Sequence, residues 1–264
     1  MLTARTADKY TLYRKSVQTP EADARFLARY YRKMTGSPLR RLREDFCGTA
    51  ELLCEFVKLH SENHGFGVDL DWEPLRWCRD HLFPEMSEAQ RRNVMLIHRD
   101  VTKLHSPKVE MIAALNFSYS CFHSRSRLLA YFRNVRRSLK KGGVFALDAH
   151  GGREVPETGT ESWNFRSFRY VWDVRGFDPV THRIECRIHF EFPDGSRIRN
   201  AFVYHWRLWT LPELRDILLD AGFRNLHVLW EDTDSRTGMG NGRMRRVERG
   251  QMEGAWYAMI LCQA

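Results

Sequence analysis

Apolar side chains follow two alternating spacings along the first 150 residues. Residues 20–35 have apolar positions at helical spacing, so we expect a helix before the first strand. Short strand-like runs then alternate with stretches of helical spacing. The expected strands are 42–46, 65–70, 94–98, 110–116 and 144–148, and the expected helices are 50–60, 73–82 and 126–140. This alternation is typical of a parallel sheet with helices on both faces.

The pattern changes beyond residue 150. Residues 163–206 contain three successive strand-like segments, with a Pro-Asp-Gly turn at 193–195. Between Ile184 and Glu191 every second side chain is apolar, which is typical of a half-buried antiparallel hairpin. We therefore expect an antiparallel β insertion after the fifth strand, with Trp163 and Trp172 in its core.

The chain then returns to helix and strand signals. Thr210 and Glu213 can form a capping box, which predicts a helix that ends at Gly222. Two further strands are expected at 225–230 and 255–262, separated by a Gly/Arg-rich loop at 231–254. The fold class predicted is α/β: a Rossmann-like, seven-stranded, mostly parallel sheet with helices on both faces, plus the β insertion.

Composition excludes some classes of protein. No apolar run approaches the ~20 residues that span a bilayer, and the N-terminal segment lacks a signal-peptide pattern. We therefore expect a cytoplasmic protein without a membrane partner. The six scattered cysteines show no metal-ligand spacing, so no metal is expected. The net charge of +9 permits an anionic partner such as RNA without requiring one, because much of it lies on solvated helix faces.

Candidate chemistry gathers where predicted strands end, because ligands of doubly wound sheets bind there. After the first strand, the segment from Asp45 to Ala50 has small residues that let the backbone approach a ligand. Asp69 follows Gly48 by 21 residues, the spacing at which an acid can accept hydrogen bonds from ribose hydroxyls.

The next two strand ends continue this series. Asp100, with Val101 beside it, is placed to meet an adenine amino group. After the fourth strand, Asn116, Phe117 and Tyr119 bring polar and aromatic groups to the place where a transferred group would lie.

In order and spacing, the segments LREDFCGTA, GVDLD, HRDV, LNFSY and LKKGGVFALDAHGG resemble the motifs of class I S-adenosyl-L-methionine (SAM) dependent methyltransferases. The resemblance covers about residues 40–150. Over nearly the whole chain, the sequence also resembles a group of bacterial methyltransferase-domain proteins without an assigned substrate. This implies SAM as cofactor and S-adenosyl-L-homocysteine (SAH) as product. The SAM contacts implied are Tyr13, Gln18, Arg43, Asp45, Cys47, Gly48, Asp69, Leu70, Asp100, Val101, Asn116 and Phe117.

The sequence departs from these motifs at the first loop. Of three usual glycines only Gly48 remains, with Phe46 and Ala50 at the outer positions. SAM carries no phosphate, so this loss argues against a dinucleotide such as NAD more than against SAM. Arg43 and Glu44 are polar for a buried strand. They fit either a salt contact to the methionine part of SAM or a local Arg/Glu pair at a sheet edge.

Methyl transfer is an in-line displacement that mainly requires alignment and exclusion of water, so a dedicated base is optional. The candidate catalytic residues are Asn116, Tyr119, His123 and His150. Asn116 and Tyr119 match the outer positions of the N/D-P-P-Y motif of amino-group methyltransferases, but both prolines are missing. The candidate substrate-binding residues are Tyr119, His205, Trp206 and Arg207, which could equally form the core of the insertion.

We expect three parts of the chain to have separate roles. Residues 1–38 would form a helical cap over the cofactor, 39–152 with 207–264 the SAM-binding core, and 153–206 an inserted module that covers the substrate. The function predicted is methyl transfer to a small-molecule N or O acceptor by a monomer or homodimer. Alternatives are an RNA or protein methyltransferase, or a non-catalytic SAM-binding regulatory protein; an NAD-dependent oxidoreductase is disfavoured.

Overall fold

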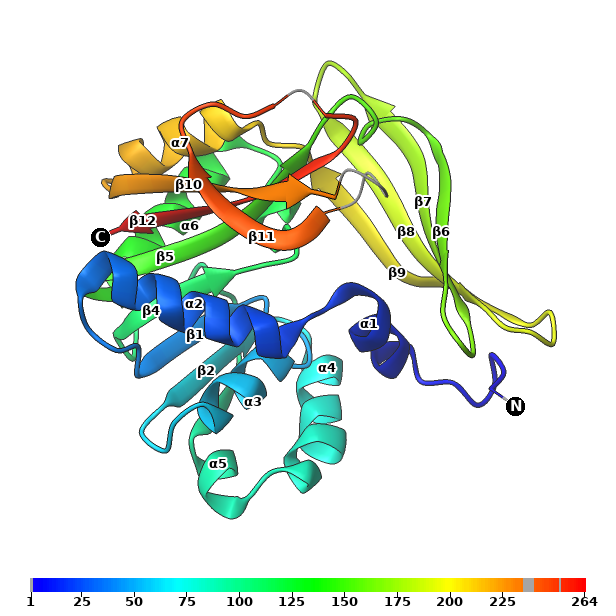
Figure 1. Cartoon of the computed structure of the whole chain (residues 1–264), viewed down its shortest axis with the longest axis horizontal. Coiled ribbons are helices and arrows are strands. Elements are labelled where there is room, and N and C mark those ends of the chain that lie inside the picture. Colours follow the sequence, from blue (N-terminus) through cyan, green and yellow to red (C-terminus); the bar gives the residue numbers. More distant parts are fainter. Residues whose placement is uncertain (1, 235–239, 252) are drawn as a thin grey trace.

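The computed structural model describes residues 2–234, 240–251 and 253–264, and its strands form two sheets (Figure 1). The larger sheet has the order β11-β10-β12-β5-β4-β1-β2-β3, and the smaller has the order β6-β7-β8-β9. Strands β1 to β5 are parallel, whereas β12 is antiparallel between β5 and β10. Strand order reverses between β1 and β4, where a doubly wound sheet binds its ligand.

The strands of the larger sheet fall where apolar runs predicted them, with one addition. They are β1 (Arg41–Asp45), β2 (His64–Asp69), β3 (Val94–His98), β4 (Val109–Ala114), β5 (Leu139–Gly151), β10 (Arg224–Thr233), β11 (Gly240–Val247) and β12 (Trp256–Gln263). Strand β11 makes the sheet eight-stranded rather than seven-stranded, and it lies in the segment 231–254 predicted as a loop. Residues 235–239 and 252 of that segment lie outside the described residues. Most of β11 is exposed, so no apolar alternation marks it; it is held by backbone pairing with β10.

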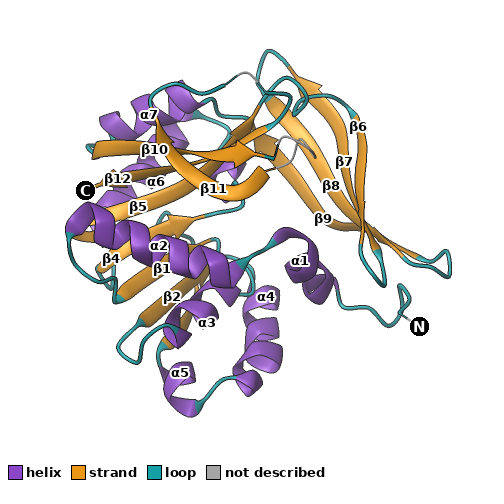
Figure 2. Ribbon diagram, viewed as in Figure 1, coloured by secondary structure: helices purple, strands orange, loops and turns teal. Residues whose placement is uncertain are grey.

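Helices cover both faces of the larger sheet, as the alternation predicted (Figure 2). They are α1 (Lys9–Val17), α2 (Pro20–Thr35), α3 (Glu51–Lys58), α4 (Trp72–Trp77), α5 (Glu88–Arg92), α6 (Arg125–Ser138) and α7 (Leu211–Asp220). Two separate apolar cores result: Leu27 and Phe56 belong to the one under α2 and α3, and Phe132 and Leu214 to the one under α6 and α7. The capping box of α7 is confirmed. The helix expected at 73–82 is present: it is α-helical to Trp77 and continues as a π-helical turn, Cys78–Leu82.

The β insertion leaves the core after β5 and stands at the carboxyl ends of the parallel strands (Figure 1). Its strands are β6 (Gly159–Asn164), β7 (Arg169–Asp178), β8 (Arg183–Glu191) and β9 (Arg197–Arg207), all antiparallel. Strand β6 was not predicted, because all of its residues are exposed.

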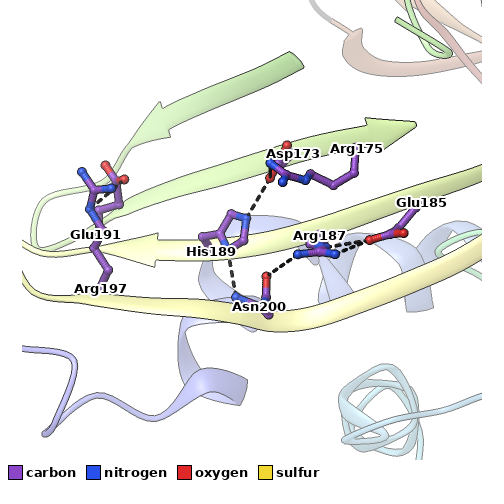
Figure 3. A network of polar contacts seen from close by, with 8 residues as sticks. All are labelled: Asp173, Arg175, Glu185, Arg187, His189, Glu191, Arg197 and Asn200. Carbon is purple, nitrogen blue, oxygen red and sulfur yellow. Dashed lines mark hydrogen bonds and ion pairs between the residues drawn. The ribbon is translucent and has the colours of Figure 1, made fainter. Parts of the chain in front are cut away.

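The alternation along β7 and β8 gives the insertion a charged face and an apolar face. Figure 3 shows the charged face, where His189 contacts Asp173 Oδ2 through Nε2 (3.2 Å) and accepts the backbone N–H of Asn200 through Nδ1 (2.8 Å). Arg187 pairs with Glu185 on the same face. The opposite face of the insertion is apolar.

Helix α1 links the insertion to the core. Leu12 is buried among Phe168, Tyr170 and Phe190 of the insertion. On the core side, Lys9 forms an ion pair with Glu73 (2.9 Å), and Arg14 pairs with Glu51 at the start of α3. No helix in the described part of the chain is long and apolar enough to cross a membrane.

Candidate functional site

Asp69 ties the end of β2 to the loop that follows β1. Its Oδ2 accepts the backbone N–H of Gly48 (2.7 Å), and its Oδ1 accepts that of Asp71 (2.9 Å). Burial raises the pKa of Asp69, and these hydrogen bonds only partly offset that effect. The structure therefore brings together Gly48 and Asp69, which the sequence analysis placed at the ends of successive strands.

The loop after β1 keeps the shape of a glycine-rich turn without its outer glycines. Phe46 (φ +59°) and Ala50 (φ +53°) adopt the left-handed conformation, as does Gly48 (φ +53°). Each non-glycine costs about 1–2 kcal/mol in this region. The Phe46 ring packs on Tyr131 at a centroid distance of 5.6 Å, which helps to hold the strained backbone. The departure in sequence thus leaves the backbone form intact.

A second left-handed turn follows β4, where Asn116 has φ +55° and Phe117 has φ +57°. The Asp148 carboxylate on β5 accepts both of their backbone N–H groups, at 2.7 and 2.9 Å. Burial raises the pKa of Asp148 to about 7, although these two hydrogen bonds oppose the shift. Asp148 therefore fixes the turn that carries Asn116.

Two more buried acids complete an acidic group, which we define as Asp23, Glu44, Asp69 and Asp148. Burial raises the pKa of Asp23 to about 6 and that of Glu44 well above its usual value. The charge of Asp23 is close enough to raise the pKa of both Glu44 and Asp148. The charge of Asp69 also raises the pKa of Glu44. Glu44 Oε2 and Gln18 Oε1 are two of the buried side-chain atoms that have no hydrogen-bond partner among the described residues. These acceptors fit a ligand that brings N–H donors and positive charge.

Arg43 and Asp45 lie on the other side of β1, away from the acidic group. Both side chains are fully buried, with Arg43 Nε 2.8 Å from Asp45 Oδ1. Tyr131 of α6 donates its hydroxyl to Asp45 Oδ2 (2.9 Å). An Arg43/Glu44 pair at a sheet edge is therefore wrong, because β1 pairs with β2 and β4 and its side chains alternate between faces. The structure does not bring Arg43 and Asp45 to the cofactor candidates.

The remaining cofactor candidates differ in exposure. Leu70 is 70% exposed directly after Asp69, so it offers apolar surface at the end of β2. Asp100 Oδ1 accepts the Thr102 N–H (2.8 Å) and hydroxyl (2.6 Å). Burial acts to raise the pKa of Asp100, but these hydrogen bonds and Lys103 lower it overall. Cys47 and Val101 are buried beneath the strand ends.

A cavity of about 950 Å³ opens between the insertion and the ends of the core strands. Three of the SAM candidates line it: Tyr13, Asn116 and Phe117. Of the catalytic and substrate candidates, Asn116, His150 and Trp206 line it as well. Phe117 contacts the His150 ring at a centroid distance of 3.9 Å, and burial lowers the pKa of His150 to about 4. His150 is therefore neutral at pH 7.

The other catalytic and substrate candidates lie elsewhere. Tyr119 is buried and donates its hydroxyl to the backbone carbonyl of Asp148 (2.8 Å). His123 and Arg207 line a separate, open pocket of about 460 Å³. The Arg207 guanidinium lies 3.8 Å from the centre of the Trp209 ring and pairs with Glu213. His205 is exposed and Arg207 is half-buried. Both are neighbours of Trp206 on β9, so they point to the opposite face of that strand.

Several cavity residues were not among the sequence candidates. They are mainly aromatic residues of the insertion and of β12, together with glutamates: Trp163, Tyr170, Trp172, Tyr204, Trp256, Tyr257, Glu154, Glu157, Glu161, Glu231 and Glu253. Trp163 and Trp172 were expected in the core of the insertion, but both line the cavity. The alternation of aromatic and polar side chains along β7 and β9 marks the aromatic face. It does not reveal that this face covers a cavity instead of a layer of helices or strands.

Asp23 offers a test of the acidic group in the ligand-free protein. Its pKa of about 6 lies above the usual 3.8, so the native state binds its proton more tightly than the unfolded chain does. The contribution of Asp23 to stability therefore falls as pH rises through about 4 to 6. We expect Asp23→Asn to gain free energy of unfolding relative to wild type between pH 5.0 and pH 7.5, measured by urea unfolding. A difference independent of pH would contradict the raised pKa.

Among the described residues, no group of three or more His, Cys, Asp or Glu is placed to hold a metal ion. No family model matches the chain, and no curated protein matches its sequence.

Solved structures match the whole architecture at low identity. A SAM-dependent methyltransferase from Clostridium acetobutylicum is 16% identical, with TM-score 0.70 over 95% of this chain and 96% of that one. The SAM-bound amino pentose methyltransferase of Micromonospora echinaspora is 16% identical (TM-score 0.66, 96% and 95% covered). The sugar N-methyltransferase from Streptoalloteichus is 15% identical (TM-score 0.61, 98% and 93% covered). The chain therefore has the fold of the class I SAM-dependent methyltransferases, with the β insertion included.

Proposed function

We propose that this protein is a SAM-dependent methyltransferase that transfers a methyl group to the N or O atom of a small molecule. The acidic group is the observation that carries the proposal. It places buried carboxylates and unpartnered acceptor atoms at the switch point of the sheet. SAM carries a sulfonium and an ammonium, which would neutralise these acids. The diphosphate of NAD would be repelled by them.

The chain offers groups for the ribose, the ammonium and the adenine of SAM. Asp69 would accept the ribose hydroxyls, with Gly48 holding it in place. Glu44 Oε2 and Gln18 Oε1 would accept hydrogen bonds from the ammonium of the methionine part, because both lack partners among the described residues. Asp100, Val101 and Leu70 would surround the adenine. In this proposal Cys47 acts only through packing, because it is buried.

The methyl end of SAM would lie at Asn116, Phe117 and Tyr13, because these residues belong to both the cofactor candidates and the cavity wall. Transfer requires the acceptor atom, methyl carbon and sulfur to be in line, and water to be excluded. The aromatic cavity provides that exclusion. His150 is neutral and faces the cavity, so one of its ring nitrogens can accept a hydrogen bond from the acceptor molecule and orient it.

The three parts of the chain would then have separate tasks. Residues 1–38 cap the cofactor site, because α1 joins the insertion to the core. Residues 39–152 and 207–264 bind SAM, and 153–206 cover the acceptor.

Among the similar structures, two are described as an amino pentose and a sugar N-methyltransferase, which favours a small acceptor over RNA or protein. For an RNA acceptor, binding would weaken steeply with salt, and the wall of the cavity would need cations for phosphate.

Calorimetry with SAM, SAH and NAD tests the proposal directly. We expect SAM and SAH to bind and NAD to show no measurable binding. A folded sample that binds neither SAM nor SAH would refute the proposed function. A sample that binds SAM but transfers no labelled methyl group to any member of a broad small-molecule panel would favour the non-catalytic regulatory alternative.

A further inference from the structure

We propose that the acceptor is a basic amine carried on an apolar or aromatic molecule, bound between the glutamates and the aromatic wall of the cavity. This inference rests on the proposed function, and it narrows an undecided N or O acceptor to one chemical class.

The charge of the cavity is opposite to that of the whole protein. The chain carries a net charge of +9. The cavity, however, is lined by five glutamates, and no Lys or Arg is among the described residues of its wall. Only one of the five, Glu154, has an ion pair within the described residues, with Arg153 at 3.6 Å and both side chains well exposed. The cavity therefore attracts cations and repels carboxylates or phosphates.

The glutamates divide between the rim and the wall. Glu154 and Glu157 are exposed on the segment between β5 and β6, and Glu161 is exposed on β6 itself. Glu231 and Glu253 are half-buried and hold nearby backbone and side chains: Glu231 accepts the N–H of Gly242 (2.8 Å), and Glu253 the hydroxyl of Thr233 (2.8 Å). The three rim glutamates can thus be changed without breaking a recorded side-chain hydrogen bond.

An aromatic wall faces this charge. Tyr204 and Trp206 lie 4.4 Å apart between ring centres, and Trp172 lies 6.0 and 6.1 Å from them. All three line the cavity. Aromatic faces bind ammonium groups through their quadrupole, more strongly when water is excluded. They also give apolar contact area to the body of the acceptor.

Polar atoms on the core side of the cavity are free to meet a ligand. Within the described residues, the side chains of His150 and Tyr257 line the cavity and form ring contacts but no hydrogen bond. The neutral imidazole of His150 offers one acceptor nitrogen, and the Tyr257 hydroxyl can accept as well. Both suit the N–H groups of an amine.

The chemistry of transfer favours nitrogen for the same reasons. An amine that enters as its ammonium must lose one proton to water, and an apolar surrounding favours the neutral form. Its lone pair then attacks the methyl carbon of SAM: the N–C bond forms, the C–S bond breaks, and sulfur keeps the electron pair as the neutral thioether. The N-methyl ammonium product can be bound by the same aromatic wall. An alcohol would require a stronger base, and burial weakens the basicity of His150.

Three probes of one shape but different charge test this inference: 2-(1-naphthyl)ethylamine, 2-(1-naphthyl)ethanol and 1-naphthylacetate. Each probe is titrated calorimetrically into the 264-residue protein, once without SAH and once with saturating SAH. We expect the amine to bind at least tenfold more tightly than the alcohol, and the carboxylate to be the weakest. Equal affinities, a preference for the alcohol or carboxylate, or no binding of the amine would overturn the inference.

A matched pair of variants locates the effect. Changing the rim glutamates to glutamine (E154Q/E157Q/E161Q) should weaken amine binding at least fivefold at low salt and leave alcohol binding within twofold. The control changes three exposed glutamates that do not line the cavity, E21Q/E62Q/E88Q, and alters net charge equally. Equal losses in both variants would overturn the assignment of the rim.

The proposed function and the proposed acceptor class can be refuted independently of each other. SAH binding in the same samples tests the proposed function, whereas the order of the three probes tests the acceptor class. If SAH does not bind, the titration without SAH still gives the order of affinities of the three probes.

Discussion

Asp69→Ala should lower the affinity for SAM at least 100-fold while the protein still folds. A carboxylate that accepts both ribose hydroxyls makes two charge-assisted hydrogen bonds, each contributing about 1.5–3 kcal/mol. A loss of about 2.7 kcal/mol already corresponds to 100-fold in the dissociation constant. Calorimetry with SAM measures the effect, and circular dichroism measures the fold. Asp69→Asn should be intermediate, because it keeps an oxygen for the Gly48 N–H but loses the charge.

The matched control is Asp71→Asn, two residues further along. Asp71 caps α4 by accepting the Glu73 N–H, and asparagine caps helices equally well. We expect its SAM affinity to stay within threefold of wild type. Unchanged affinity in Asp69→Ala would refute the assignment of Asp69 to the ribose.

Asp148→Ala should remove the support of the turn at Asn116 and Phe117. Both residues have left-handed backbones, and their N–H groups would lose their acceptor in a buried place. Each unsatisfied buried N–H costs about 1–3 kcal/mol, so we expect the free energy of unfolding to fall by about 2–5 kcal/mol. Urea unfolding measures this loss. SAM binding should weaken as well, because the turn carries Asn116.

Asp148→Asn provides the control, because its amide oxygen can still accept one of the two N–H groups. Its loss of stability should be smaller than that of the alanine variant. The loss should also shrink as pH rises from about 4 to 7, because asparagine removes the buried carboxyl whose pKa is raised. If both variants unfold within about 0.5 kcal/mol of wild type, the turn does not depend on Asp148.

The sequence predicted the features that depend on residues close together along the chain, such as strand ends and a helix cap. Strand ends follow from apolar runs, and the spacing from Gly48 to Asp69 follows from one β-α-β unit. The sequence placed both residues at strand ends, and the structure adds the contact between them. The capping box at Thr210 was likewise local, since its partners are three residues apart.

The sequence did not reveal what depends on exposure or on partners far along the chain. Strands β6 and β11 are mostly exposed, so no apolar alternation marks them. Whether Arg43 meets Asp45 or a ligand depends on Tyr131 of α6, which packs on that face of β1. Local spacing contains no information on that choice.

The sequence by itself determined the order of helices and strands, the position of the insertion and the residues at the strand ends. It did so because apolar periodicity shows which face of each element is buried. Only the tertiary structure decided how those residues combine. The acidic group joins α2, β1, β2 and β5, and the cavity joins α1, the insertion and β12. Burial and charge act through space, so the raised pKa values and the negative cavity in a basic protein exist only once the chain has folded.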